Sequence, residues 1–218
     1  MREIYLLSGL GADKRVFDFI DLPGFKLNHV CWIDPLDDES IEGYAKRLLA
    51  QIPAARPTLI GLSFGGMLSI EIGKIIETEK IILISSAKTL ADIPLSFRKM
   101  ARLGIHKVIP PRLFKSVNPF TYWFFGTKSK KEKDLLAAIL KDTDETFFTW
   151  AIGKIAAWKN VTTLRNVMHI HGTNDKVLPC MSADFKISNG GQLMILDNGE
   201  EVSRIILEIL REPVIDIK

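Results

Sequence analysis

The chain has 218 residues, which is the length of one domain, or of one domain that carries a sizeable insertion. Apolar residues make up 47% of it, so a substantial core can form. The formal net charge is only +3, from 29 basic and 26 acidic residues, and the basic residues are spread along the sequence. This balance argues against a nucleic-acid-binding protein, because such proteins gather basic residues on one surface.

The chain carries two cysteines, Cys31 and Cys180, in unlike contexts. They make no disulfide framework, which favours a reducing compartment, and we expect the protein in the cytoplasm. The apolar run from Ile4 to Leu7 is too short for a signal peptide and predicts a first strand instead. No apolar stretch is long enough to span a bilayer, so we expect no membrane partner.

The first part of the chain alternates strand and helix patterns. Strands are predicted at Ile4–Leu7, Leu27–Ile33, Thr58–Ile60 and Lys80–Ser86. Helices are predicted at Val16–Ile20, at Met67–Ile76, and from an N-cap at Ser40 to Ile52. Apolar strands separated by amphipathic helices are typical of a parallel sheet that helices cover on both faces. The predicted fold class is therefore α/β.

Residues 88–160 break this alternation. Helical patterns dominate there, prolines interrupt them, aromatic residues are concentrated, and no strand is convincing. One helix is predicted around Leu135 to Leu140, and another from Phe147 to Trp158 with Asp142 as its N-cap. We therefore predict a helical cap at 88–160, inserted into a core made of 1–87 and 161–218.

The alternation resumes after this insertion. Strands are predicted at Val167–His171 and Phe185–Ile187, and a closing amphipathic helix at Glu200–Leu210. Little sequence separates Asp175 from the last strand, so we expect a loop there in place of a crossover helix.

The most informative motif is Gly61-Leu62-Ser63-Phe64-Gly65-Gly66, between a predicted strand and a predicted helix. A G-x-S-x-G sequence in this position is typical of a nucleophile elbow, a sharp turn that exposes the serine hydroxyl. Glycines leave room for the turn and for close packing of the helix on the strand. Such a serine needs a base, a carboxylate that orients the base, and N–H donors for the oxyanion.

Three motifs, each after a predicted strand and in the expected order, resemble the α/β-hydrolase family. They are Ser8-Gly9-Leu10-Gly11, the elbow, and His171-Gly172-Thr173-Asn174-Asp175-Lys176-Val177-Leu178-Pro179. The resemblance covers the whole chain and implies a small, capped serine hydrolase without the family's first two strands. It implies Ser63 as nucleophile, Asp175 as acid, and the backbone N–H groups of Leu10 and Phe64 as the oxyanion hole.

The sequence departs from the family at the position of the catalytic histidine. Where the family has a glycine-rich turn ending in histidine, this chain has Asn189-Gly190-Gly191-Gln192. The Gln192 amide does not titrate near neutral pH, although it can hold Ser63 and Asp175 in register by hydrogen bonds. Loss of the histidine from a comparable triad lowers kcat by a factor on the order of 10⁶.

Other residues have competing interpretations. His171 is the histidine nearest to the predicted site and is a candidate substitute base, or it hydrogen-bonds within its own turn. Asp175 is alternatively a simple turn residue. Phe124, Phe125 and Trp150 are candidates for a substrate pocket, although most cap aromatics are expected to form core. No metal is expected, since no acidic or cysteine ligand lies at a helpful spacing from the histidines, and acyl transfer needs no cofactor.

Three functions remain open from the sequence. The first is a serine hydrolase acting on a small ester, thioester, lactone or amide, in which glutamine has replaced histidine naturally or by engineering. The second is a catalytically silent protein that binds or senses a small molecule. The third is a hydrolase that uses His171, or water, as its base. All three predict a small-molecule partner, and none predicts an oligomeric state.

Overall fold

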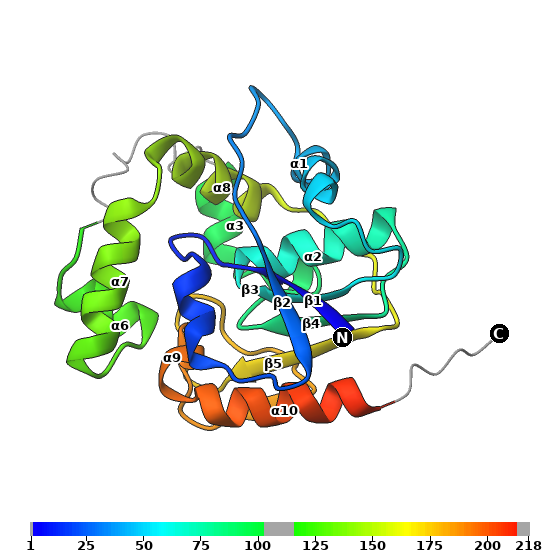
Figure 1. The fold of residues 1–218 in the computed structure, drawn as a ribbon. Helices are drawn as coiled ribbons and strands as arrows, with labels where there is room; N and C mark the ends of the chain where they lie inside the picture. Colours follow the sequence, from blue (N-terminus) through cyan, green and yellow to red (C-terminus); the bar gives the residue numbers. More distant parts are fainter. Residues whose placement is uncertain (1, 103–115, 213–218) are drawn as a thin grey trace.

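The structure, a computed structural model, describes residues 2–102 and 116–212. Six strands form one sheet in the order β2-β1-β3-β4-β5-β6, and all neighbouring strands are parallel (Figure 1). The strands are β1 (Arg2–Leu7), β2 (Phe25–Val30), β3 (Thr58–Leu62), β4 (Lys80–Ile84), β5 (Val167–Gly172) and β6 (Phe185–Ile187). The prediction of an α/β fold with a parallel sheet is confirmed.

Two apolar cores lie on opposite faces of the sheet because side chains alternate along each strand. In β1, Ile4 and Leu6 belong to the core that contains η1 (Lys14–Phe19) and α10 (Gly199–Arg211). Tyr5 and Leu7 belong to the opposite core, with α1 (Ile41–Leu48) and α2 (Phe64–Ile75). Figure 1 shows α10 along one face of the sheet and α1 and α2 on the other.

The connections agree with the predictions, with one addition. The chain between β5 and β6 contains no helix, as expected from the short spacing there. A short helix that the sequence did not indicate, α9 (Met194–Asp197), precedes α10. Two short 3-10 helices are also present: η2 (Leu49–Gln51) follows α1, and η3 (Leu90–Asp92) lies at the start of the insertion described next.

Between β4 and β5 lies what we call the cap segment, residues 88–160, whose described residues form four α-helices. They are α3 (Leu95–Arg102), α6 (Pro119–Phe125), α7 (Lys130–Asp142) and α8 (Glu145–Ala157). The described part of the segment contains no strand, as predicted. Its treatment as a domain separate from the core remains a prediction.

The predicted N-cap of α8 was wrong by two residues. The side chain of Asp144, not Asp142, accepts the N–H of Phe147 at 2.7 Å. Asp142 is the last residue of α7, and its carboxylate lies 2.9 Å from the guanidinium of Arg15. Both aspartates fit the sequence pattern of an N-cap, but α7 continues through Asp142, so only Asp144 lies outside a helix and can cap α8.

The cap segment packs directly on the loop that follows β1. Leu136 and Leu140 of α7 and Phe148 of α8 are buried in the same core as Ile4. A side-chain carbon added to Gly11 would come within 2.9 Å of Leu140. The cap segment therefore covers the region where the sequence predicts the oxyanion hole.

Within the described residues, no helix is long and apolar enough to cross a membrane.

Candidate functional site

Ser63 stands at a strained turn between β3 and α2. Its backbone angles are φ 52° and ψ −119°, a region that residues with side chains rarely occupy. A side chain at Gly65 would clash with the carbonyl oxygens of Leu7 and Ser8, and one at Gly61 would clash with Gly66. These close approaches explain why the turn needs glycines on both sides of the serine. Strain of this kind is concentrated at functional sites.

The end of β4 holds this turn in place. The N–H of Ser63 donates to the carbonyl of Ile84 at 2.9 Å. The hydroxyl of Ser86 donates to the carbonyl of Ser63 at 2.6 Å. Ser85 and Ser86 fell at the end of the predicted strand Lys80–Ser86 and were given no role there, whereas β4 ends at Ile84. Their position beside the elbow follows from the pairing of β3 with β4.

Two backbone segments flank the Ser63 side chain, which is partly exposed. Phe64 is the first residue of α2, so its N–H belongs to the helix end where N–H groups have no partner within the helix. On the other side, a carbon added to Gly9 would lie 3.1 Å from Cβ of Ser63, which places the loop containing Leu10 against the serine. This arrangement is compatible with the predicted oxyanion hole.

Asp175 is buried, with 6% of its surface exposed. Its Oδ1 accepts the N–H groups of Val177 at 2.8 Å and Leu178 at 3.0 Å, so it is a turn residue in part. Its Oδ2 lies 3.1 Å from Nε2 of His171. The predicted acid therefore has an imidazole partner, but that partner comes from its own strand and loop.

His171 is held on both sides. Its Nε2 also lies 2.7 Å from the carbonyl oxygen of Leu178, and its Nδ1 lies 2.8 Å from Nε2 of His169. Because both ring nitrogens have partners away from Ser63, this geometry gives no support to His171 as a substitute base. Burial, and then the neighbouring His171, lower the pKa of His169 to about 3.

Gln192 is buried, and its side chain is directed elsewhere than predicted. Its Nε2 donates to the carbonyl of Ser85 at 2.9 Å, and its Oε1 has no hydrogen-bond partner among the described residues. The expectation that it holds Ser63 and Asp175 in register was wrong, because the amide anchors the end of β4 instead. The next residue, Leu193, donates its N–H to the carbonyl of Phe125 at 3.3 Å, which ties this turn to α6.

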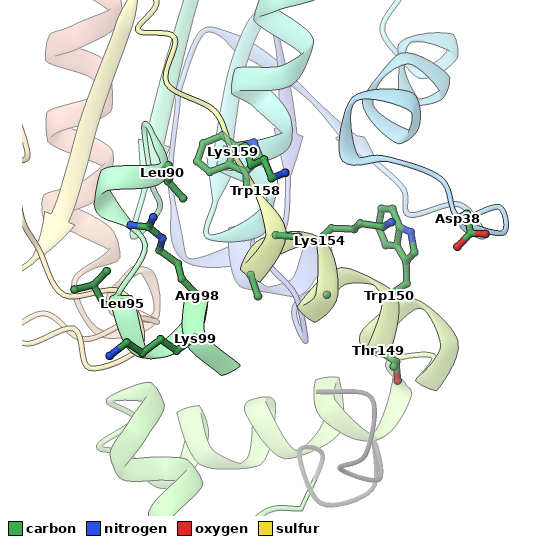
Figure 2. Close-up of a pocket in the computed structure, with 13 residues that line it drawn as sticks. Asp38, Leu90, Leu95, Arg98, Lys99, Thr149, Trp150, Lys154, Trp158 and Lys159 are labelled. Carbon is green, nitrogen blue, oxygen red and sulfur yellow. The ribbon is translucent and has the colours of Figure 1, made fainter. Parts of the chain in front are cut away.

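The three predicted pocket residues lie on two different helices. Phe124 and Phe125 are at the end of α6, where Phe124 stacks on Phe120 with ring centroids 5.8 Å apart. Trp150 of α8 packs edge-on against Phe64 with centroids 6.1 Å apart. Trp150 also lines a hollow of about 1000 Å³ between α3 and α8. Figure 2 shows the basic residues that line this hollow: Arg98, Lys99, Lys154 and Lys159.

A smaller cavity of about 240 Å³ lies closer to the predicted oxyanion hole. It is bounded by Gly11 and Ala12, which follow Leu10 in the chain, and by Trp32 and Phe147. The rings of Trp32 and Phe147 stack with centroids 5.1 Å apart, and both contact Phe64. Trp32 and Phe147 were not predicted as pocket residues, because Trp32 comes from the loop after β2 and Phe147 from the cap segment.

Solved structures similar to this chain include named esterases and hydrolases. An esterase from Thermogutta terrifontis is 15% identical, with a TM-score of 0.71 over 97% of this chain and 90% of that chain. A hydrolase from Pseudomonas aeruginosa PA01 is 13% identical, with a TM-score of 0.73 over the same shares. An enol-lactonase from Burkholderia xenovorans LB400 is 16% identical, with a TM-score of 0.66 over 97% and 92%.

These similarities show the fold. The chain has the α/β-hydrolase fold, as its three motifs predict, with a six-stranded parallel sheet and the elbow after β3. No family model and no curated protein matches the sequence.

Proposed function

We propose that this protein binds a small ester, thioester, lactone or amide at Ser63 and transfers its acyl group slowly. The observation that carries the proposal is the backbone of Ser63, held at φ 52° between β3 and α2 with partly exposed side chain. Evolution retains such strain where a residue must be presented to a ligand. The similarity to named esterases and to an enol-lactonase supports the same class of reaction.

In the proposed reaction, the Ser63 hydroxyl attacks the carbonyl carbon of the substrate. The N–H groups of Leu10 and Phe64 stabilise the negative charge that develops on the carbonyl oxygen. The bond from the carbonyl carbon to the leaving oxygen, sulfur or nitrogen then breaks, and the hydroxyl proton passes through solvent water to the leaving group. Water hydrolyses the acyl-serine, which releases the carboxylic acid and restores the hydroxyl. The proton of the hydroxyl has no general base to receive it, because the amide of Gln192 does not titrate near neutral pH. In a comparable protease, the remaining binding and oxyanion stabilisation give roughly 10³–10⁴ over the reaction in water.

The 240 Å³ cavity supports a small acyl group with no negative charge. Its apolar wall is formed by Trp32 and Phe147. Its polar wall includes four aspartates, Asp13, Asp34, Asp142 and Asp144. Arg15 pairs with two of them, Asp13 at 2.5 Å and Asp142 at 2.9 Å, so the wall stays negative. Neutral esters are therefore preferred to esters of dicarboxylic acids.

Hydrolysis of p-nitrophenyl butyrate tests this proposal. The unaltered chain is expected to show a slow rate that Ser63→Ala removes. Gln192→His is expected to raise that rate by about 10²–10⁴, the usual contribution of a general base. Gln192→Asn is the matched control, since it changes the side chain without supplying a titratable group. The same rate in the chain, in Ser63→Ala and in Gln192→His would overturn the proposal.

A second candidate function is binding without turnover. It is favoured by one observation, that the Gln192 amide is fixed on the carbonyl of Ser85 while Asp175 is already paired with His171. This function predicts that γ-butyrolactone raises the melting temperature of the chain, that Ser63→Leu removes the effect, and that Gln192→His gives no hydrolysis dependent on Ser63.

A further inference from the structure

A line of hydrogen-bonding groups, buried from His169 onward, runs from the loop before β6 to Asp175. It begins at the carbonyl of Ser182, which lies 3.1 Å from Nδ1 of His169. It continues through the 2.8 Å contact between Nε2 of His169 and Nδ1 of His171. It ends at Nε2 of His171, 2.7 Å from the carbonyl of Leu178 and 3.1 Å from Oδ2 of Asp175. Both imidazoles are 2% exposed.

The number of ring protons that these contacts require determines the net charge of His169 and His171. The carbonyl oxygens of Ser182 and Leu178 only accept hydrogen bonds, so the ring nitrogens facing them must both carry protons. The contact between the rings needs a third proton, since two bare nitrogen lone pairs at 2.8 Å repel one another. Two neutral imidazoles carry only two N–H groups in total. The fully bonded pair of His169 and His171 therefore carries one positive charge.

The charge that balances this proton is on Asp175. Its Oδ1 accepts two backbone N–H groups, from Val177 and Leu178, so this oxygen acts only as an acceptor. Its Oδ2 faces His171, so opposite charges are adjacent in a buried place. Without the extra proton, this carboxylate would be a buried charge with no counter-ion, which is strongly unfavourable.

The other charged groups around the pair leave this balance unchanged. Oδ2 of Asp184 accepts the backbone N–H of His169 at 2.8 Å and also pairs with Lys88 at 2.8 Å. Lys186 of β6 is opposite His171 in the strand register and is exposed. Burial, the neighbouring His171 and Lys88 lower the pKa of His169, so the pair does not take up a second proton near neutral pH.

We propose that His169 and His171 share one proton beyond the two that neutral rings carry, and that the pair serves as the internal counter-ion that positions Asp175. His171 is then a positioning residue that keeps the carboxylate oriented without a histidine at position 192. This explains how the fold keeps an ionised, buried acid after Gln192 has taken the place of the base. The significance of Asp175 for catalysis rests on the proposed function, whereas the charge of the pair does not.

Nitrogen NMR of the unaltered chain, labelled with ¹⁵N at histidine, tests the proposal without a substrate. At pH 7, three of the four ring nitrogens of His169 and His171 are expected to be protonated. Their signals are expected to stay constant from pH 8 to pH 5, because the extra proton is retained and no second one enters. His29 of β2, which has no part in this line, serves as the reference ring.

His171→Gln provides the second measurement, because it keeps a hydrogen-bond donor and removes the charge. In this variant His169 is expected to become a neutral ring with one protonated nitrogen. Two protonated nitrogens for the pair in the unaltered chain, or titration of both rings between pH 5 and pH 8, would overturn the proposal. Failure of ester hydrolysis would not produce either result, so the two proposals fail separately.

Discussion

A double-mutant cycle between His171 and Asp175 measures the coupling of the two buried groups. Asp175→Asn keeps the size of the side chain and one acceptor oxygen, but it leaves the shared proton without its counter-ion. Removal of one member of a buried ion pair costs about 3–5 kcal/mol, since a charge is left uncompensated. For a chain of this length, each kcal/mol of lost stability lowers Tm by about 2–4 °C, so this loss corresponds to a fall in Tm of roughly 6–20 °C.

The reciprocal variant, His171→Gln, leaves the Asp175 carboxylate uncompensated and is expected to cost a similar amount. The double variant removes both charges, so its cost is expected to fall short of the sum by about 2 kcal/mol or more. Urea unfolding followed by circular dichroism gives the four free energies. The exposed pair of Lys26 and Glu3, 2.6 Å apart, is the matched control, for which little or no coupling is expected because solvent screens the two charges. Costs at His171 and Asp175 that add to within about 0.5 kcal/mol would refute the charged pair.

Three further predictions concern stability. The unfolding free energy of Ser63→Gly is expected to be about 1 kcal/mol higher than that of Ser63→Ala, because glycine tolerates φ 52°. Equal stability of the two variants in thermal unfolding would show that the turn is not strained. Gly65→Ala is expected to cost about 1–3 kcal/mol through its clash with two carbonyls, whereas Gly43→Ala in α1, with ordinary contacts, is expected to gain about 0.5–1 kcal/mol in the same assay. Because folding lowers the pKa of His169, the unfolded chain binds a proton below pH 6.5 that the folded chain does not. The unfolding free energy is therefore expected to fall by up to about 1.4 kcal/mol per pH unit from pH 6.5 toward pH 3. In His169→Gln, the unfolding free energy measured with urea is expected to depend less on pH between 6.5 and 5.

The strands and the elbow were predictable because their signals are local. The apolar run before Ser63 and the glycines after it fix a strand, a turn and a helix within a few residues of one another. Because side chains alternate along a strand, the predicted strand Val167–His171 also implies that His169 and His171 share one face. Their partners were not predictable, because Leu178 and Ser182 reach them only after the loop folds back over the strand.

The direction of the Gln192 side chain was equally beyond the sequence. The spacing from the last strand placed it where a base is expected, but the amide bonds to the carbonyl of Ser85. Ser85 itself has φ 45°, so the chain turns sharply after β4 and presents that carbonyl to the turn at Gln192. Such a contact depends on how two turns far apart in sequence pack together, which no local pattern encodes.

Whether Ser63 is a nucleophile without a base is tested most directly by covalent labelling with a fluorophosphonate. Mass spectrometry of the digested protein locates the adduct, and its rate of formation is compared between the unaltered chain and Gln192→His. We predict slow labelling at Ser63, at least about 100-fold faster with the imidazole restored. Equal rates in the two proteins, or an adduct at any other residue, would contradict the proposed site.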